Sequence, residues 1–204
     1  MSDAALNLLL SILPALIIAI ILAGLTAAIT HAVRSEKKKK EALKKLGEIL
    51  PGELTTRGMS HVFHGDCKGT LFAVELQPGS RNEPPCLVVS VTAAPSFRLN
   101  VCREFFMSSA EKRLGLLQDM DTCDHRFNTE FIISADNQAL AAPYLNDTQR
   151  RLDIWSFFNA GFRSFAIEQD GLRIRKPRYA PEADLQPAAL AAMVGKLSLL
   201  AKAS

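Results

Sequence analysis

The stretch that decides how the chain is organised is residues 8–25, which read LLLSILPALIIAIILAGL. It is the densest part of a longer run, residues 4–33, that contains no charged side chain. About 20 apolar residues are enough for a helix to cross a bilayer. Pro14 does not oppose this interpretation, because proline is tolerated in membrane helices. We therefore predict that residues 1–33 form a transmembrane anchor.

The charges around this run predict its orientation. Asp3 precedes it, with no Lys or Arg, whereas the basic residues all follow it: Arg34, Lys37, Lys38, Lys39, Lys40, Lys44 and Lys45. The positive-inside rule then places the N-terminus outside and the rest of the chain on the cytoplasmic side of a bacterial inner membrane. A cleaved signal peptide ending near residues 30–32 is the alternative, but it would need a basic start and a shorter apolar core.

A cytoplasmic location also determines how the cysteines are interpreted. The chain has four, Cys67, Cys86, Cys102 and Cys123, with no Cys-x-x-Cys spacing. Thiols of a cytoplasmic domain stay reduced. We therefore expect free thiols, either buried as small hydrophobic side chains or exposed at the surface.

Residues 34–52 predict a basic juxtamembrane helix. Leu43, Leu46, Ile49 and Leu50 recur at helical spacing, and Pro51 with Gly52 ends the pattern. The lysines of this helix could rest on anionic lipid headgroups, or they could only fix the topology. The narrow apolar stripe could pair with a second copy or with a partner helix. Residues 53–59 then read as a linker into the folded domain.

Residues 60–204 have the pattern of one cytoplasmic α+β domain. The predicted strands are residues 60–64, 70–76, 86–92, 97–106, 127–134, 163–168 and 172–176, with the last two joined across Asp170 and Gly171. Helices are predicted from Asp136 or Asn137 to Leu145, from Asn146 or Asp147 to Gly161 with Leu152, Trp155, Ser156 and Phe158 on the apolar side, and over residues 188–202. Residues 108–117 could add a helical turn. Because the strands come in runs joined by hairpins, we predict a mostly antiparallel sheet packed by two or three helices.

Part of this domain resembles a group of bacterial proteins. The residues concerned are 124–127, 131–133, Leu145, 150–152 and 170–174. They resemble the C-terminal half of single-pass membrane proteins whose cytoplasmic α+β domain has no known function. That group carries an F-D-x-x-F-like strand, a helix pair and a D-G-x-L-x-I-like hairpin. Here Cys123 stands in place of the first Phe and the hairpin is one residue shorter, so the resemblance implies architecture and no activity.

Candidate metal ligands occur near the start of the domain. His61, His64, Asp66 and Cys67 have the side chains that bind zinc, and Cys123 and His125 lie elsewhere. On a strand, positions three apart point to opposite faces, so we expect His61 and His64 to diverge. A metal site using His61, His64 and Cys67 stays as an alternative.

Two other clusters carry weaker chemical signals. Asp119, Asp121 and Asp124 resemble part of a calcium loop but lack its glycine and its distant glutamate, so we interpret them as a solvated acidic loop. Cys123 and His125 could suggest a nucleophile and base, but catalytic pairs are normally assembled from positions far apart in the sequence. Phosphate-loop, dinucleotide, hydrolase and zinc-protease motifs are absent, which favours a domain without catalysis and points to no cofactor.

A second basic group lies near the C-terminus: Arg163, Arg173, Arg175, Lys176 and Arg178, with Tyr179 beside it. Arg173 and Arg175 share one face of a strand. They could meet lipid headgroups or nucleic acid, or form a solvated face; the lack of interleaved aromatic residues disfavours nucleic acid.

The sequence therefore predicts a single-pass membrane protein whose cytoplasmic domain binds or scaffolds another protein or a second copy of itself. Alternatives are an accessory subunit of a membrane complex, and a membrane-tethered metal-dependent enzyme using His61, His64 and Cys67. The expected membrane contacts are the lysines and the arginine of residues 34–45 with anionic headgroups.

Overall fold

The computed structural model describes residues 3–58, 60–103 and 120–202, without the side chains of residues 3–16, 18, 19 and 57. The chain divides into two units, Met1–Glu41 and Ala42–Ser204. The predicted helical turn at residues 108–117 and the last linker residue, Met59, lie outside the described residues.

The first unit consists of most of helix α1, Asp3–Leu46. Seven of its apolar side chains are 48–63 % exposed: Ile17, Ile20, Ile21, Leu22, Leu25, Ile29 and Val33. Thr26 and Thr30 donate their hydroxyls to carbonyls of the same helix, Leu22 O at 3.0 Å and Thr26 O at 2.8 Å. Their polar groups are therefore satisfied without water. Among the residues that the structure describes, no helix is both long enough and apolar enough to span a bilayer. Much of the predicted span, residues 4–16, lacks described side chains.

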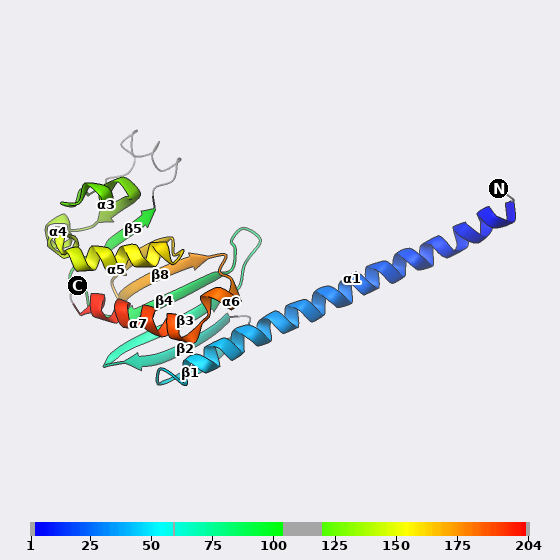
Figure 1. The fold of residues 1–204 in the computed structure, drawn as a ribbon, viewed down its shortest axis with the longest axis horizontal. Coiled ribbons are helices and arrows are strands. Elements are labelled where there is room, and N and C mark those ends of the chain that lie inside the picture. Colours follow the sequence, from blue (N-terminus) through cyan, green and yellow to red (C-terminus); the bar gives the residue numbers. More distant parts are fainter. Residues whose placement is uncertain (1–2, 59, 104–119, 203–204) are drawn as a thin grey trace. The chain divides into compact units, whose positions relative to one another are not determined.

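The second unit is built on one sheet. In the described part of the chain, eight strands pair antiparallel in the order β1-β2-β3-β4-β8-β7-β5-β6 (Figure 1). Their bounds are β1 Gly52–Arg57, β2 Ser60–Cys67, β3 Thr70–Gln77, β4 Cys86–Thr92, β5 Leu99–Arg103, β6 Phe131–Ala135, β7 Ser164–Glu168 and β8 Gly171–Pro177. The predicted antiparallel α+β fold is confirmed.

The helices of this unit are α3 His125–Glu130, α4 Gln138–Asn146, α5 Thr148–Asn159, α6 Pro181–Asp184 and α7 Pro187–Ala201. Asn137 and Asp147 cap α4 and α5 by accepting backbone N–H groups, as predicted. Helices α5 and α7 lie across the same face of the sheet (Figure 1). That face supplies the core, with Val74, Val89 and Ile174 fully buried on neighbouring strands.

The end of α1 belongs to this core. Leu43 and Leu46 are 0 % exposed within the second unit, and Gly47 lies beside the ring of Phe63. The predicted stripe therefore packs against the domain itself, which corrects the idea that all of it faces a partner helix. Ile49, also in that stripe, is 50 % exposed.

Three local predictions are wrong. Residues expected to form a linker, 53–57, belong to β1, which pairs with β2 along its whole length. The strand predicted at 127–134 begins at Phe131, because the Asp124 side chain accepts hydrogen bonds from the backbone N–H groups of Arg126 and Phe127 and starts α3 instead. In α5, Leu152 is 55 % exposed while Arg151 is buried, so the apolar side was placed incorrectly.

The predicted hairpin at Asp170 and Gly171 is confirmed. Gly171 begins β8 with φ of +150°, and a Cβ there would lie 2.0 Å from the carbonyl oxygen of Val91 on β4. A side chain at this position would clash with the neighbouring strand. The glycine therefore allows β8 to pair closely with β4. This pairing connects strands β1 to β4 with strands β5 to β8 in one sheet.

We expect Leu46→Ala to lower the free energy of unfolding by about 2–5 kcal/mol, because the truncation leaves a cavity in a fully buried site. Ile49→Ala is the matched control and should change it by about 0.5 kcal/mol or less, since this residue is half exposed. The measurement is urea denaturation of the full chain, followed by the fluorescence of Trp155. Equal effects of the two substitutions would contradict the packing of α1 into the core.

Candidate functional site

The face of the sheet opposite the helices is the candidate binding surface, here called the open face. Within the second unit, helices α5 and α7 pack on the core face of the sheet (Figure 1). They leave the opposite face uncovered. Strand alternation puts the second set of side chains here, and many are small: Ala73, Ser90, Ser134, Ser164 and Ala166. Small side chains let the backbone of a ligand or partner approach the sheet.

Two arginines of β8 lie in the middle of the open face. Arg173 forms an ion pair with Glu168, its Nη1 3.0 Å from Oε2. Arg175 is two residues further along and faces the same way, as predicted, while Ile174 between them is buried in the core. Among the described residues, no side chain pairs with the Arg175 guanidinium. Of the two arginines of β8, Arg173 is therefore neutralised, whereas Arg175 has no side-chain partner in the described part of the chain.

Shallow hollows interrupt this face in the described strands, and two of them include Ser164 or Ala166 of β7 in their lining. One has a volume of about 230 Å³ and includes Glu83, Pro84, Cys86, Arg163, Ser164 and Arg175 in its lining. The other has a volume of about 320 Å³ and lies over β5, β6 and β7, with Arg98, Asn100, Ser134, Asp136, Ala166 and Glu168 in its lining. Both hollows combine charged side chains with small or apolar ones.

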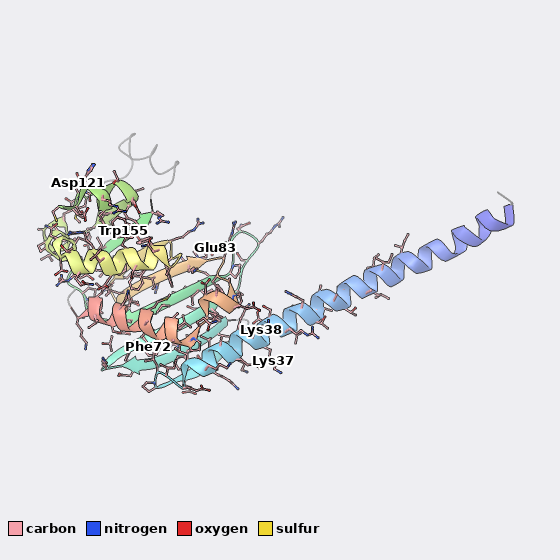
Figure 2. The ribbon with its side chains drawn as sticks, in the orientation of Figure 1. Lys37, Lys38, Phe72, Glu83, Asp121 and Trp155 are labelled. Atoms are coloured by element: carbon pink, nitrogen blue, oxygen red, sulfur yellow. The ribbon has the colours of Figure 1, made fainter. Side chains whose placement is uncertain are left out.

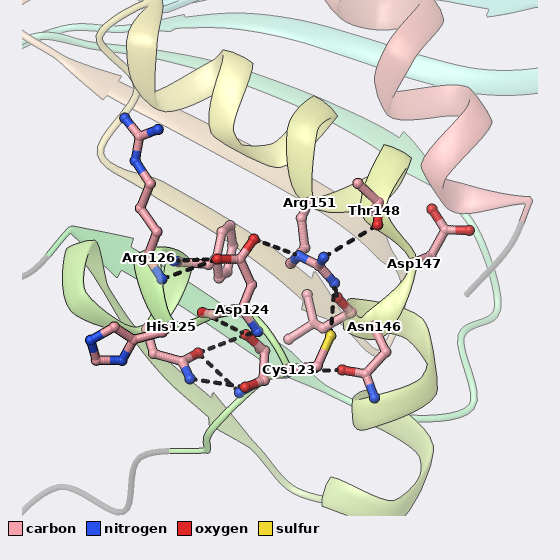
Figure 3. A network of polar contacts seen from close by, with 12 residues as sticks. Cys123, Asp124, His125, Arg126, Asn146, Asp147, Thr148 and Arg151 are labelled. Atoms are coloured by element: carbon pink, nitrogen blue, oxygen red, sulfur yellow. Dashed lines mark hydrogen bonds and ion pairs between the residues drawn. The ribbon is translucent and has the colours of Figure 1, made fainter.

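A separate polar network lies at the end of the helix layer (Figure 3). Arg151 is 7 % exposed and donates from Nη1 to the carbonyl oxygen of Leu145 at 2.7 Å and to Cys123 Sγ at 3.4 Å. Its Nη2 donates to Thr148 Oγ1 at 3.3 Å. Its Nε lies 3.3 Å from Asp124 Oδ2, an ion pair without the alignment of a hydrogen bond. These contacts tie the segment before α3 to the junction of α4 and α5.

The charge of Asp124 is stabilised by this arrangement. The backbone N–H of Phe127 holds the pKa of the Asp124 carboxyl below its usual value, and the N–H of Arg126 and the Arg151 guanidinium add to this effect, against a partial burial that raises it. Nearby, burial raises the pKa of Tyr144, whose hydroxyl donates to Leu200 O at 3.3 Å. Because each of these contacts joins two segments of the domain, we assign the network to folding.

The candidate metal ligands do not converge. His61 is buried on the core side of β2, with its Nδ1 3.3 Å from Thr56 Oγ1, whereas His64 is exposed on the opposite side. Cys67 is buried at the far end of the same strand, six residues from His61, or about 20 Å along the strand. In the described ranges, no three His, Cys, Asp or Glu side chains form a metal-binding group.

The remaining predicted site residues fall in different places. Asp119 lies outside the described residues, and Cys123, an exposed thiol, contacts Arg151 rather than a histidine. In the basic segment of α1, Lys39 pairs with Glu36, and the side chains of Arg34, Lys37, Lys40, Lys44 and Lys45 are exposed. Figure 2 marks Lys37 and Lys38 on this helix.

Two features of the domain were not predicted from the sequence. Arg151 was overlooked, although its spacing to Ile154 and Phe158 places it on the buried side of α5. The open face was also not recognised, although β7 alternates Ser164, Ala166 and Glu168 with buried Phe165 and Ile167. That alternation is the signal that could have found it.

The fold and the open face define an α+β domain with an antiparallel sheet covered by helices on one side. No family model and no curated protein matches the sequence. Among solved structures, the chain is similar to the crystal structure of the mycobacterial trehalose monomycolate transport factor A (TtfA), with a TM-score of 0.50 and 11 % identity. The similarity covers 81 % of this chain and 94 % of that chain. At this identity the likeness is one of fold.

We expect the stability that Asp124 contributes to be present at neutral pH and to disappear in acid. Its folded pKa lies below the ordinary value of 3.8, so this stability is lost as the pH falls through the folded pKa. Asp124→Asn keeps a capping side chain but removes the charge. The variant should be less stable at pH 7 and should lose less stability than the natural chain between pH 5 and the acid transition.

The measurement is urea denaturation of both chains at a series of pH values, followed by Trp155 fluorescence. Asp136→Asn is the matched control, because this exposed loop residue also accepts a backbone N–H, that of Arg98, but forms no ion pair with the described residues. Parallel pH profiles for the natural chain and Asp124→Asn would contradict the assignment.

Proposed function

We propose that the protein is a single-pass membrane-anchored protein whose C-terminal domain is an interaction module facing the cytoplasm. The observation that carries the proposal is the exposure of the apolar side chains of α1. A helix that is apolar on all sides requires an apolar environment, and each exposed apolar Å² costs about 25 cal/mol in water. Residues 4–33 contain no charged side chain, which supports a bilayer as that environment.

The basic residues that follow support the orientation and a contact with lipid. Arg34 and Lys37 to Lys45 lie on the C-terminal side of the apolar run, the arrangement that keeps this side in the cytoplasm. Each basic residue near anionic headgroups contributes about 1 kcal/mol. The domain begins at residue 42, so the chain between Lys40 and the domain is very short. The module therefore works close to the membrane surface.

The open face is the surface that we assign to a protein partner. It presents small side chains, an ion pair of Arg173 with Glu168, and hollows with charged rims. Interfaces of non-obligate complexes have this mixed polarity. Since His61, His64 and Cys67 diverge, the metal-dependent alternative receives no support from this geometry.

A second candidate function is that of an accessory subunit in a membrane complex. The fold similarity to TtfA favours it, since that protein is described as a transport factor. From this similarity we propose only the kind of role, which is that of an auxiliary protein in a transport process. We propose no transported substrate.

We expect the natural chain to stay with membranes after a carbonate wash, and the double variant Ile21→Arg with Leu25→Arg to move to the soluble fraction. Each arginine near the centre of a spanning helix costs about 2.5–3.5 kcal/mol on insertion scales. Ile49→Arg, an exposed apolar position outside the run, is the control and should stay in the membrane. A natural chain found in the wash, or a C-terminal reporter active outside the cytoplasm, would refute the anchor or its orientation.

We expect a photo-crosslinking amino acid at Ser90, in the open face, to give one discrete adduct in cells. The same group at Ala192, an exposed position on α7, should give no adduct of that mass. The measurement is the mass of the products on a denaturing gel, with identification by mass spectrometry. Adducts of equal yield from both positions, or from neither, would contradict the open face as the partner surface.

A further inference from the structure

The hollow beside Arg175 has the size and the charge of a site for one small group. Its volume of about 230 Å³ lies below the range of about 300–1,000 Å³ that is usual for drug-sized ligands. It lies where β4, β8 and β7 meet at one end of the open face. Cys86 pairs with Pro177, and Arg175 pairs with Ser164, in the register of these strands. The side chains of three strands thus converge on one place.

One cationic group of this hollow, the Arg175 guanidinium, is available for a ligand. Among the residues that the structure describes, the Arg175 guanidinium has no side-chain partner, whereas Arg173 on the same face is held by Glu168 at 3.0 Å. Lys176, the next residue along β8, is also committed, with its Nζ 2.7 Å from Asp184 Oδ1. A guanidinium presents its donors as a planar fork that matches the oxygens of phosphate.

The surroundings of Arg175 complete a site for an anion. Ser164 stands directly opposite on β7, and side chains of such pairs lie about 4.5–5.5 Å apart at Cβ. Its hydroxyl can donate to the same anion. Arg163 also lines the hollow, and its backbone N–H donates to Arg175 O at 2.8 Å, which fixes the two residues side by side. Pro84 and Pro177, with restricted backbones, give the hollow a rigid wall.

Glu83 sets a limit on the affinity. It lies in the loop that joins β3 and β4 (Figure 2) and lines the same hollow. A turn holds this loop, in which Ser80 N donates to Glu83 O at 2.8 Å and Glu83 N donates to Ser80 Oγ at 3.2 Å. A carboxylate repels a nearby anion, so Glu83 weakens phosphate binding. Removing its charge should therefore strengthen binding, whereas removing the charge of Arg175 should weaken it.

We propose that this hollow binds a phosphate group, with the Arg175 guanidinium as the cationic donor and the Ser164 hydroxyl as the second donor. The phosphate belongs either to a lipid headgroup or to a free phosphate compound. The proposal goes beyond the membrane anchor and the partner surface, since it uses residues of the C-terminal unit alone. If phosphate does not bind, the expected membrane and crosslinking results stay the same. If the membrane or crosslinking experiment fails, the expected phosphate binding stays the same.

The test is a titration of the full chain, in an uncharged maltoside detergent, with inorganic phosphate. We expect saturable binding to one site with a dissociation constant of about 1 mM, the range of a small ligand with few contacts. Arg175→Gln should weaken binding about tenfold, since it removes charge-assisted hydrogen bonds. Arg173→Gln, on the same strand and face, is the matched control and should change it by about twofold or less. Glu83→Gln should strengthen it.

The source of the phosphate is assigned by competition. Nanodiscs with phosphatidic acid will displace inorganic phosphate if the site takes a lipid headgroup, whereas nanodiscs of phosphatidylcholine alone will not. If neither lipid displaces it, the site takes a free phosphate compound. The proposal is overturned if the natural chain shows no saturable binding, or if Arg173→Gln and Arg175→Gln weaken binding equally. Unchanged unfolding midpoints of the variants exclude loss of the fold as the cause.

Discussion

The structure depends on the burial of only one face of an eight-stranded antiparallel sheet. In the described strands, helices cover that face, and strand alternation places most of the polar side chains on the other, although Val88 and Ile132 on that other face are also buried. Phe165 and Ile167 enter the core while Ser164, Ala166 and Glu168 remain outside. Arg173 and Arg175 are outside for the same reason. The candidate binding surface is thus a direct consequence of how the core is built, because the residues that cannot enter the core are placed together on the other face.

The burial of Leu43 and Leu46 joins α1 to this architecture. These two residues are fully buried, so the last turn of α1 is part of the domain and not a free stalk. A flexible linker would let the domain sample many positions around its anchor. Here residues 40–43 are helical, as part of α1, and do not form such a linker.

The sequence was informative where one local rule dominates. Period-two alternation and the turn at Asp170 and Gly171 predicted β8 and β7, and Asp147 predicted the start of α5. It failed where tertiary contacts decide. Residues 53–57 contain no strong strand signal and become β1 because β2 offers an unpaired edge. Phe127 is helical because Asp124 caps it. Arg151 is buried because Leu145, Asp124 and Cys123 offer it partners that are distant in the sequence or in another element.

The contrast between the two open-face arginines explains why composition could not reveal a site. In the sequence, one basic cluster is formed by Arg163, Arg173, Arg175, Lys176 and Arg178, yet the fold gives its members different roles. Glu168 neutralises Arg173, and Asp184 binds Lys176 on the core side. Arg175 keeps its donors beside a hollow with a serine opposite. Binding specificity then arises from which charge the fold leaves uncompensated, and the number of basic residues has little influence on it.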